Sequence, residues 1–247
     1  MLFRSANHRL RFAPTNVHAI LVVDQEGGKQ KYYADVGACN KMEAQALIPL
    51  ISNGAYVGDL EMASTLYAGK SFDDRAGCAV ILQVMDEMQI ANENRVVGIF
   101  TAREETGEWP TAELIQCCQK NDLWPDLILN LEVCPGGPTP LDKNPEAYVG
   151  KGVVLAHMDR YYACDHKLSH FMIDTAQKYH IHHQHMTIRS GGGEIGRLAL
   201  SFGVLSYSFT IPVRYMHAPN SVMSKVDYEA TIAMVKSVIV DWKGLER

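Results

Sequence analysis

The sequence predicts an α/β protein, a three-layer sandwich in which helices cover both faces of a mostly parallel central sheet. An apolar run rich in β-branched residues, which is typical of a buried strand, occupies 96–101, and further strands are predicted at 127–133 and 204–209. Segments whose apolar residues recur at helical spacing lie between these strands. Strands that alternate with helices in this way favour parallel pairing through crossover helices.

The helical spacing is clearest in 75–90, where Val80, Ile81, Val84 and Met85 form one apolar stripe. A helix over 111–120 follows Pro110, a residue well suited to the start of a helix. From residue 66 onward the expected order is helix 75–90, strand 96–101, helix 111–120, strand 127–133, strand 153–156, helix 167–179, strand 186–188, helix 194–202, strand 204–209 and helix 226–242.

The first part of the chain has a different pattern. Two short apolar segments, 17–23 and 31–36, are separated by the turn composition Asp24-Gln25-Glu26-Gly27-Gly28, and a short helix is expected over 41–50. We therefore predict a β-rich unit over residues 1–65 and the α/β unit over residues 66–247.

Composition narrows the class of protein. The chain has 247 residues, 47% of them hydrophobic, and a net charge of −5, so neither nucleic acid nor an anionic membrane is an expected partner. No apolar run approaches the roughly 20 residues of a membrane span, and the first residues lack the apolar core of a signal peptide. The six cysteines form no CxxC pair, and we expect a cytoplasmic protein.

The adjacent acids Glu104 and Glu105 follow the predicted strand 96–101. At the carboxyl end of a sheet strand, where the chain turns, both side chains can line one crevice, and open α/β sheets keep their sites there. One carboxylate could then bind a metal while the other moves a proton of the water on that metal. The alternative is a solvated pair of glutamates in a loop.

Three further positions carry groups that can bind metal at the end of a strand or the start of a helix. Asp73 and Asp74 precede the helix 75–90, Glu132 ends an apolar strand, and His217 follows another strand. One aspartate could instead cap the helix, and the histidine could be structural. Because strand ends converge in a doubly wound sheet, the set could hold a pair of divalent ions, and Zn²⁺ or Co²⁺ suits mixed nitrogen and oxygen ligands.

Five strings make the chain resemble the tetrahedral (glutamyl-type) aminopeptidases, a family of co-catalytic zinc metallopeptidases. The resemblance extends from about residue 30 to the end of the chain. The strings are Tyr33-Ala34-Asp35-Val36-Gly37-Ala38, Phe72-Asp73-Asp74-Arg75-Ala76-Gly77, Thr101-Ala102-Arg103-Glu104-Glu105-Thr106-Gly107, Gly191-Gly192-Gly193-Glu194-Ile195-Gly196 and Ile211-Pro212-Val213-Arg214-Tyr215-Met216-His217.

The resemblance implies a zinc-exopeptidase-like fold in which residues 1–65 are the remnant of an inserted β-rich dimerisation domain. It implies that Asp73 bridges two divalent ions, with a cis peptide bond to Asp74, and that Glu104 is the general base. The further metal ligands that it implies are Glu105, Glu132 and His217. Glu132 stands where the family usually has aspartate. Asp74, Arg214 and Glu194 are expected to hold the metal ligands in position without binding the metal themselves.

The chain also departs from the family pattern. Gly193-Glu194-Ile195 stands where the family has Thr-Asp-Ala. The family's further histidine ligand, in a His-Met-Asp context near its N-terminus, has no counterpart at that place, so the chain lacks the family's N-terminal segment. Ala156-His157-Met158-Asp159 repeats the letters later in the chain and makes His157 a possible substitute. We expect one of the two metal sites to be weakened.

The function that follows from the resemblance is that of a metal-dependent aminopeptidase, which removes N-terminal residues from peptides with a metal-activated water. Activity reduced by the shorter N-terminus is part of this expectation. The alternatives are a non-catalytic subunit that retains fold and assembly surfaces, and a deacylase of the same metallohydrolase clan. Peptide substrates and a homo-oligomer are expected; a nucleic acid or membrane partner is not.

Overall fold

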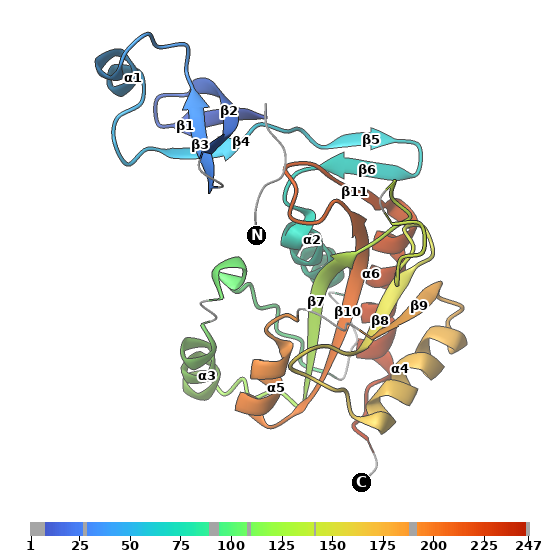
Figure 1. Cartoon of the computed structure of the whole chain (residues 1–247). Coiled ribbons are helices and arrows are strands. Elements are labelled where there is room, and N and C mark those ends of the chain that lie inside the picture. The colour runs from blue at the N-terminus through green and yellow to red at the C-terminus, as the bar shows by residue number, and fades with distance from the viewer. Residues whose placement is uncertain are drawn as a thin grey trace.

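The computed structural model describes residues 8–26, 29–88, 94–107, 110–140, 142–187 and 192–245. The strands of this part of the chain form two separate sheets, and helices pack around the larger one (Figure 1). None of the helices in the described ranges is long and apolar enough to cross a membrane.

The smaller sheet is formed by the first quarter of the chain and is entirely antiparallel, in the order β3-β2-β1-β4. Figure 1 shows it set apart from the rest, with the short helix α1 at its side. Asn40 caps α1 by accepting a hydrogen bond from the Glu43 N–H. The elements are β1 (Arg9–Ala13), β2 (Val17–Glu26), β3 (Lys29–Asp35), α1 (Lys41–Leu47) and β4 (Asn53–Tyr56).

The larger sheet has seven strands in the order β5-β6-β11-β10-β8-β9, with β7 paired to β10. The α/β class is confirmed, but the sheet is mixed and not mostly parallel among the described strands. Only the β7–β10 and β8–β9 pairs are parallel, because β8, β11 and the β5–β6 hairpin reverse direction. The strands are β5 (Glu61–Ala63), β6 (Leu66–Gly69), β7 (Leu127–Pro135), β8 (Val153–Met158), β9 (His183–Thr187), β10 (Leu205–Arg214) and β11 (Ser221–Ser224).

Helices cover both faces of the larger sheet, as a three-layer sandwich requires. On one face α2, α4 and α6 pack against the strands and each other, and on the other α5 packs against β7 and β10 with α3 beside it (Figure 1). All five helices lie close to their predicted positions: α2 (Phe72–Glu87), α3 (Thr111–Lys120), α4 (His166–Lys178), α5 (Ile195–Phe202) and α6 (Lys225–Asp241). The last residue of the predicted strand 186–188 lies outside the described residues.

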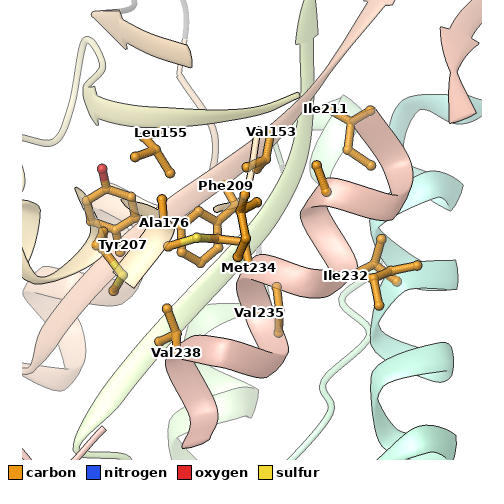
Figure 2. Packing of buried hydrophobic residues seen from close by; sticks show 14 of the residues in the cluster. Val153, Leu155, Ala176, Tyr207, Phe209, Ile211, Ile232, Met234, Val235 and Val238 are labelled. Carbon is orange, nitrogen blue, oxygen red and sulfur yellow. The ribbon is translucent and has the colours of Figure 1, made fainter. Parts of the chain in front are cut away.

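The main core lies between β10, β8 and helix α6. Figure 2 shows Tyr207 and Phe209 of β10 beside Met234 and Val235 of α6, and all four side chains are buried. Helices cover both faces of β10, so its polar residues Ser206, Ser208 and Thr210 are buried as well as its apolar residues. This core fixes the strand whose end carries His217.

The predicted strand 96–101 is wrong in one respect. The segment is extended, but it pairs with no strand among the described residues. Its apolar side chains are 40% exposed at Ile99 and 50% exposed at Phe100. Residues 96–101 have the composition of a β-strand. A β-strand also needs a neighbouring strand to pair with, and no described strand lies against this segment.

Asp227 ties the start of α6 to the loop before β8. Its fully buried carboxylate accepts hydrogen bonds from the Gly150 and Gly152 N–H groups at 2.7 and 2.6 Å. Both glycines have positive φ, at 92° and 99°, a region that other residues rarely adopt. Burial raises the pKa of Asp227 to about 6, so the group is an anion at neutral pH.

Replacing Asp227 with alanine should destabilise the chain more than any change on the exposed face of α6. The two buried N–H groups would lose their acceptor, which costs about 3 kcal/mol and about 10 °C in Tm for a chain of this size. Thermal unfolding at pH 7 measures this, with Glu229→Ala on the exposed face as the control. Equal melting temperatures for the two variants would contradict the account.

Candidate functional site

Asp73 lies at the irregular start of α2. Ser71 before it is left-handed, with φ 58°, and Asp73 itself has non-helical angles. The peptide bond from Asp73 to Asp74 is cis, as the family resemblance implies. Phe72 is buried against the core and anchors this turn, so the Asp73 carboxylate projects away from the helix axis toward the loops at the strand ends.

Asp74 caps helix α2, which is the alternative role that the sequence left open for one of the two aspartates. Its Oδ1 accepts a hydrogen bond from the Gly77 N–H at 2.9 Å and so satisfies a free donor of the first turn. Gly77 is needed for this approach, because a Cβ there would collide with the Asp74 carboxylate. Asp74 thus stabilises the start of α2 and holds the backbone that presents Asp73.

Glu104 and Glu105 form a single short 3₁₀ turn, Glu104–Thr106. The turn begins after Arg103 and ends at Gly107, both left-handed with φ 72° and 71°. A regular strand would send adjacent side chains to opposite faces. This turn instead lets both carboxylates line the same cavity, as expected for a paired site.

His217 lies in the loop between β10 and β11, in a left-handed conformation with φ 61°. Its Nε2 lies 2.8 Å from Asp73 Oδ2 and 3.6 Å from Glu105 Oε2. Its buried Nδ1 has no hydrogen-bond partner among the described residues. One ligand atom from each of Asp73, Glu105 and His217 lies within 4.8 Å of the others, and no other group of three metal-binding side chains in the described ranges meets this condition.

This donor set fits a divalent transition metal. Two carboxylates and one imidazole make a mixed oxygen and nitrogen site of the kind that Zn²⁺ and Co²⁺ accept, and three protein ligands leave a position open. The three groups come from α2, the 3₁₀ turn and the β10–β11 loop, so the fold brings them together from distant parts of the sequence.

The raised pKa values of the clustered acids also favour a cation site. Burial, reinforced by the charge of Glu105, raises the pKa of Asp73 to about 6. Burial also raises the pKa of Asp74 to about 8 and that of Glu132 well above its usual range, with the neighbouring carboxylates as a further cause. The charge of Glu104 contributes to all three shifts, so Glu104 lies close to the cluster. A cation would relieve this crowding of acids.

The other predicted site residues do not belong to the group formed by Asp73, Glu105 and His217. Glu132, near the end of β7, lines the same cavity as Glu104 and Glu105 but does not join the group of three. Glu194 is buried at the start of α5 and accepts a hydrogen bond from the Thr101 hydroxyl at 2.8 Å, just before the 3₁₀ turn. Arg214 ends β10 and has a buried Nε without a partner among the described residues.

His157 does not lie in the metal-binding group. Its Nε2 is 2.9 Å from His185 Nδ1, and its Nδ1 is 2.6 Å from the Ser169 hydroxyl and 3.1 Å from that of Tyr207. Both ring nitrogens are therefore engaged between β8, β9 and α4. This network could not be predicted from the sequence, since only the fold brings its four residues together.

The acids stand at one end of a cavity of about 750 Å³. Its walls are β7 on one side and the extended residues 94–101 on the other, and apolar side chains of α2, α5 and α6 line its length. The cavity thus joins a charged end, where the candidate metal ligands gather, to a long apolar interior.

Comparison with solved structures agrees with this architecture. A TET aminopeptidase from a marine-sediment Thaumarchaeota archaeon superposes with a TM-score of 0.84 at 25% identity, over 97% of this chain and 72% of that one. An aminopeptidase from Desulfurococcus kamchatkensis has a TM-score of 0.81 at 21% identity, over 98% of this chain and 71% of that one, which is evidence of the shared fold.

Comparison of sequences is consistent with the structures. A protein of Acetivibrio thermocellus named "Putative aminopeptidase" is 27% identical over 212 residues, which is 85% of this chain and 62% of that protein. The chain thus spans about three fifths of the length of that relative. The profile of the M42 glutamyl aminopeptidases matches residues 17–234, and this match covers most of the chain. The chain therefore belongs to the M42 glutamyl aminopeptidase family.

Proposed function

We propose that the chain is a metal-dependent aminopeptidase that removes N-terminal residues from peptides. One observation carries the proposal: Asp73, Glu105 and His217 offer ligand atoms within 4.8 Å of one another, with Glu104 on the same turn as Glu105. The names of the structural relatives, both aminopeptidases, and membership in the glutamyl aminopeptidase family support the choice of reaction.

The three ligands would hold one divalent ion, Zn²⁺ or Co²⁺, at the charged end of the cavity. Such an ion, when bound, polarises a carbonyl and lowers the pKa of water. Asp73 and Glu105 would hold it through carboxylate oxygens and His217 through Nε2, the atom that faces both carboxylates. The Glu194–Thr101 hydrogen bond holds the chain just before the turn that carries Glu105.

Glu104 is proposed as the general base. It neighbours Glu105 on the 3₁₀ turn and lines the same cavity, so its carboxylate can accept a proton close to the metal ligands without being one itself. The same group can then deliver that proton to the amine that leaves when the peptide bond breaks. The two adjacent acids therefore have different roles, with Glu105 as a metal ligand and Glu104 as the group that transfers the proton.

We further propose a site for a second ion beside the first. Asp73 and Glu132 both line the cavity, and a bridging Asp73 would serve both ions. Among the described residues these two acids have no third metal-binding partner. We therefore propose one tightly held ion and one weakly held ion, because affinity falls steeply with the number of ligands.

The acidic surroundings favour substrates with a free amine. Asp73, Glu104, Glu105 and Glu132 all line the cavity and would attract the positively charged N-terminus of a peptide. A deacylase would instead meet a blocked, uncharged nitrogen. A non-catalytic subunit would need no metal at all, so bound metal separates this alternative from both enzymes.

Assembly and cellular location belong to the same proposal. We propose a homo-oligomer, because the unit of the smaller sheet and strand β5 expose large apolar side chains that a partner could cover, among them Met42, Leu50 and Ile51 of that unit and Met62 of β5. A cytoplasmic location is supported by the six cysteines, none of which is paired.

Replacing Glu104 with glutamine should separate the base from the ligands. Metal content should stay the same, and turnover of a glutamyl or leucyl anilide should fall about 100-fold or more, since proton transfer is lost while the ion remains. Elemental analysis and initial rates measure the two quantities. Glu105→Gln is the matched control and should lose metal and activity together. Loss of metal in the Glu104 variant would make that residue a ligand.

Metal affinity should fall in acid, because protons compete with the ion for its ligands. The pKa of Asp73 is raised to about 6, and a carboxylate must lose its proton to bind a metal. The Kd for Zn²⁺ should therefore be nearly constant above pH 7 and rise by roughly tenfold per pH unit below 6.

Calorimetric titration between pH 5 and 7.5 tests this pH dependence. It should be run in a His170→Gln background, because His166 and His170 on α4 have Nε2 atoms 3.1 Å apart and could bind added Zn²⁺ as a pair. Affinity that does not change between pH 7 and 5 would exclude Asp73 as a ligand.

A further inference from the structure

The long cavity beside β7 has features that peptide hydrolysis at its charged end does not explain. β7 pairs with β10 on one side only, and its other edge faces the cavity without a strand partner among the described residues. Residues 127 to 132 all line the cavity. An unpaired strand edge next to apolar side chains leaves backbone groups without hydrogen bonds, which folded proteins avoid.

The opposite wall is a second extended segment, held in place but unpaired. Asn94 donates to the carbonyl oxygens of Ile239 and Trp242 at 2.7 and 2.9 Å, and Thr101 donates to Glu194 at 2.8 Å. Between these ends Gly98 lies so close to α2 that a Cβ would collide with Met85. The segment is therefore fixed at a distance from β7.

Helices close the remaining two sides. Val84 of α2 and Val238 of α6 line one face of the cavity, and Leu114 of α3 and Leu198 of α5 line the other. The space therefore has the edge of β7 on one side, the extended segment on the other, and a helix layer above and below, with a volume of about 750 Å³. In a three-layer sandwich this is the surrounding of a central strand.

We propose that the cavity accepts one apolar β-strand, which pairs with β7 on one side and with residues 96–101 on the other. The segment 96–101 and β7 each lead to an acid of the site, Glu104 and Glu132, so the inserted strand would complete the sheet up to the charged end. Because helices cover both faces, the strand needs apolar residues on both faces, as buried parallel strands have.

The occupant that we infer is the polypeptide that relatives possess and residues 1–247 do not. The archaeal TET aminopeptidase superposes on 97% of this chain, yet 28% of its own chain has no counterpart here (100 minus the 72% covered). A second copy of this chain fits less well, because helices close the cavity above and below and leave room for a single segment and not for the edge of a whole sheet. The inference concerns strand pairing and does not depend on metal or peptidase chemistry.

The test adds candidate strands to the full chain and follows amide hydrogen exchange. The probes are overlapping 15-residue peptides that cover the parts of the Acetivibrio thermocellus relative outside its 212 matched residues. Shuffled peptides of the same composition are controls. At least one peptide should bind and slow exchange about tenfold or more at residues 96–101 and 127–132 together.

Variants locate the binding. Ile99→Asp places a charge on the wall of the cavity at a side chain that is 40% exposed, so the chain should fold but lose peptide binding. Leu200→Asp, at an 83% exposed side chain outside the cavity, should bind as before.

Two results would overturn the proposal. The first is that no peptide binds and both segments are already protected in the chain alone at low concentration. The second is protection of both segments that appears without peptide and grows with protein concentration, which would assign the cavity to a second copy. Neither result depends on catalytic activity, so the proposed function would still be tested separately.

Discussion

The mutual repulsion of acids that are crowded together in a partly buried site is the constraint on which the site depends. Burial raises the pKa of Asp73 to about 6 and that of Asp74 to about 8, and the charges of Glu104 and Glu105 raise both. Burying carboxylates side by side lowers the stability of a protein unless a cation or a proton compensates. The arrangement is therefore understandable as a cation site, and the imidazole of His217, 2.8 Å from Asp73, supplies the nitrogen ligand that such a site needs.

The surrounding structure serves mainly to hold these groups in place. Asp74 caps α2 and thereby presents Asp73, and the buried strand β10 leads directly to the loop of His217. The 3₁₀ turn of Glu104 and Glu105 lies between two left-handed residues and is tied to α5 through Thr101 and Glu194. Residues 96–101, which lead to this turn, lack such backbone support, because no described strand lies beside them.

Much of this could be predicted from the sequence, and the failures have physical causes. Helices were found because amphipathic spacing and caps are local signals, as the agreement at Thr111–Lys120 illustrates. Short exposed strands such as β5, Glu61–Ala63, carry no alternating pattern and were missed. The strand 96–101 was predicted from propensity, which cannot show whether a partner edge exists. The site residues were named through family strings, while the contact of His217 with Asp73 and the engagement of His157 elsewhere required the fold.

X-ray absorption at the zinc edge tests the central claim most directly, because it reports the atoms that touch the ion. The account predicts that the chain loaded with one equivalent of Zn²⁺, in a His170→Gln background, has one imidazole and at least two carboxylate oxygens at about 2.0–2.2 Å, without sulfur. His217→Gln should remove the imidazole signal and leave the oxygens. A shell of two or more imidazoles, a sulfur ligand, or a spectrum unchanged by the His217 variant would contradict the assignment of Asp73, Glu105 and His217 as the metal centre.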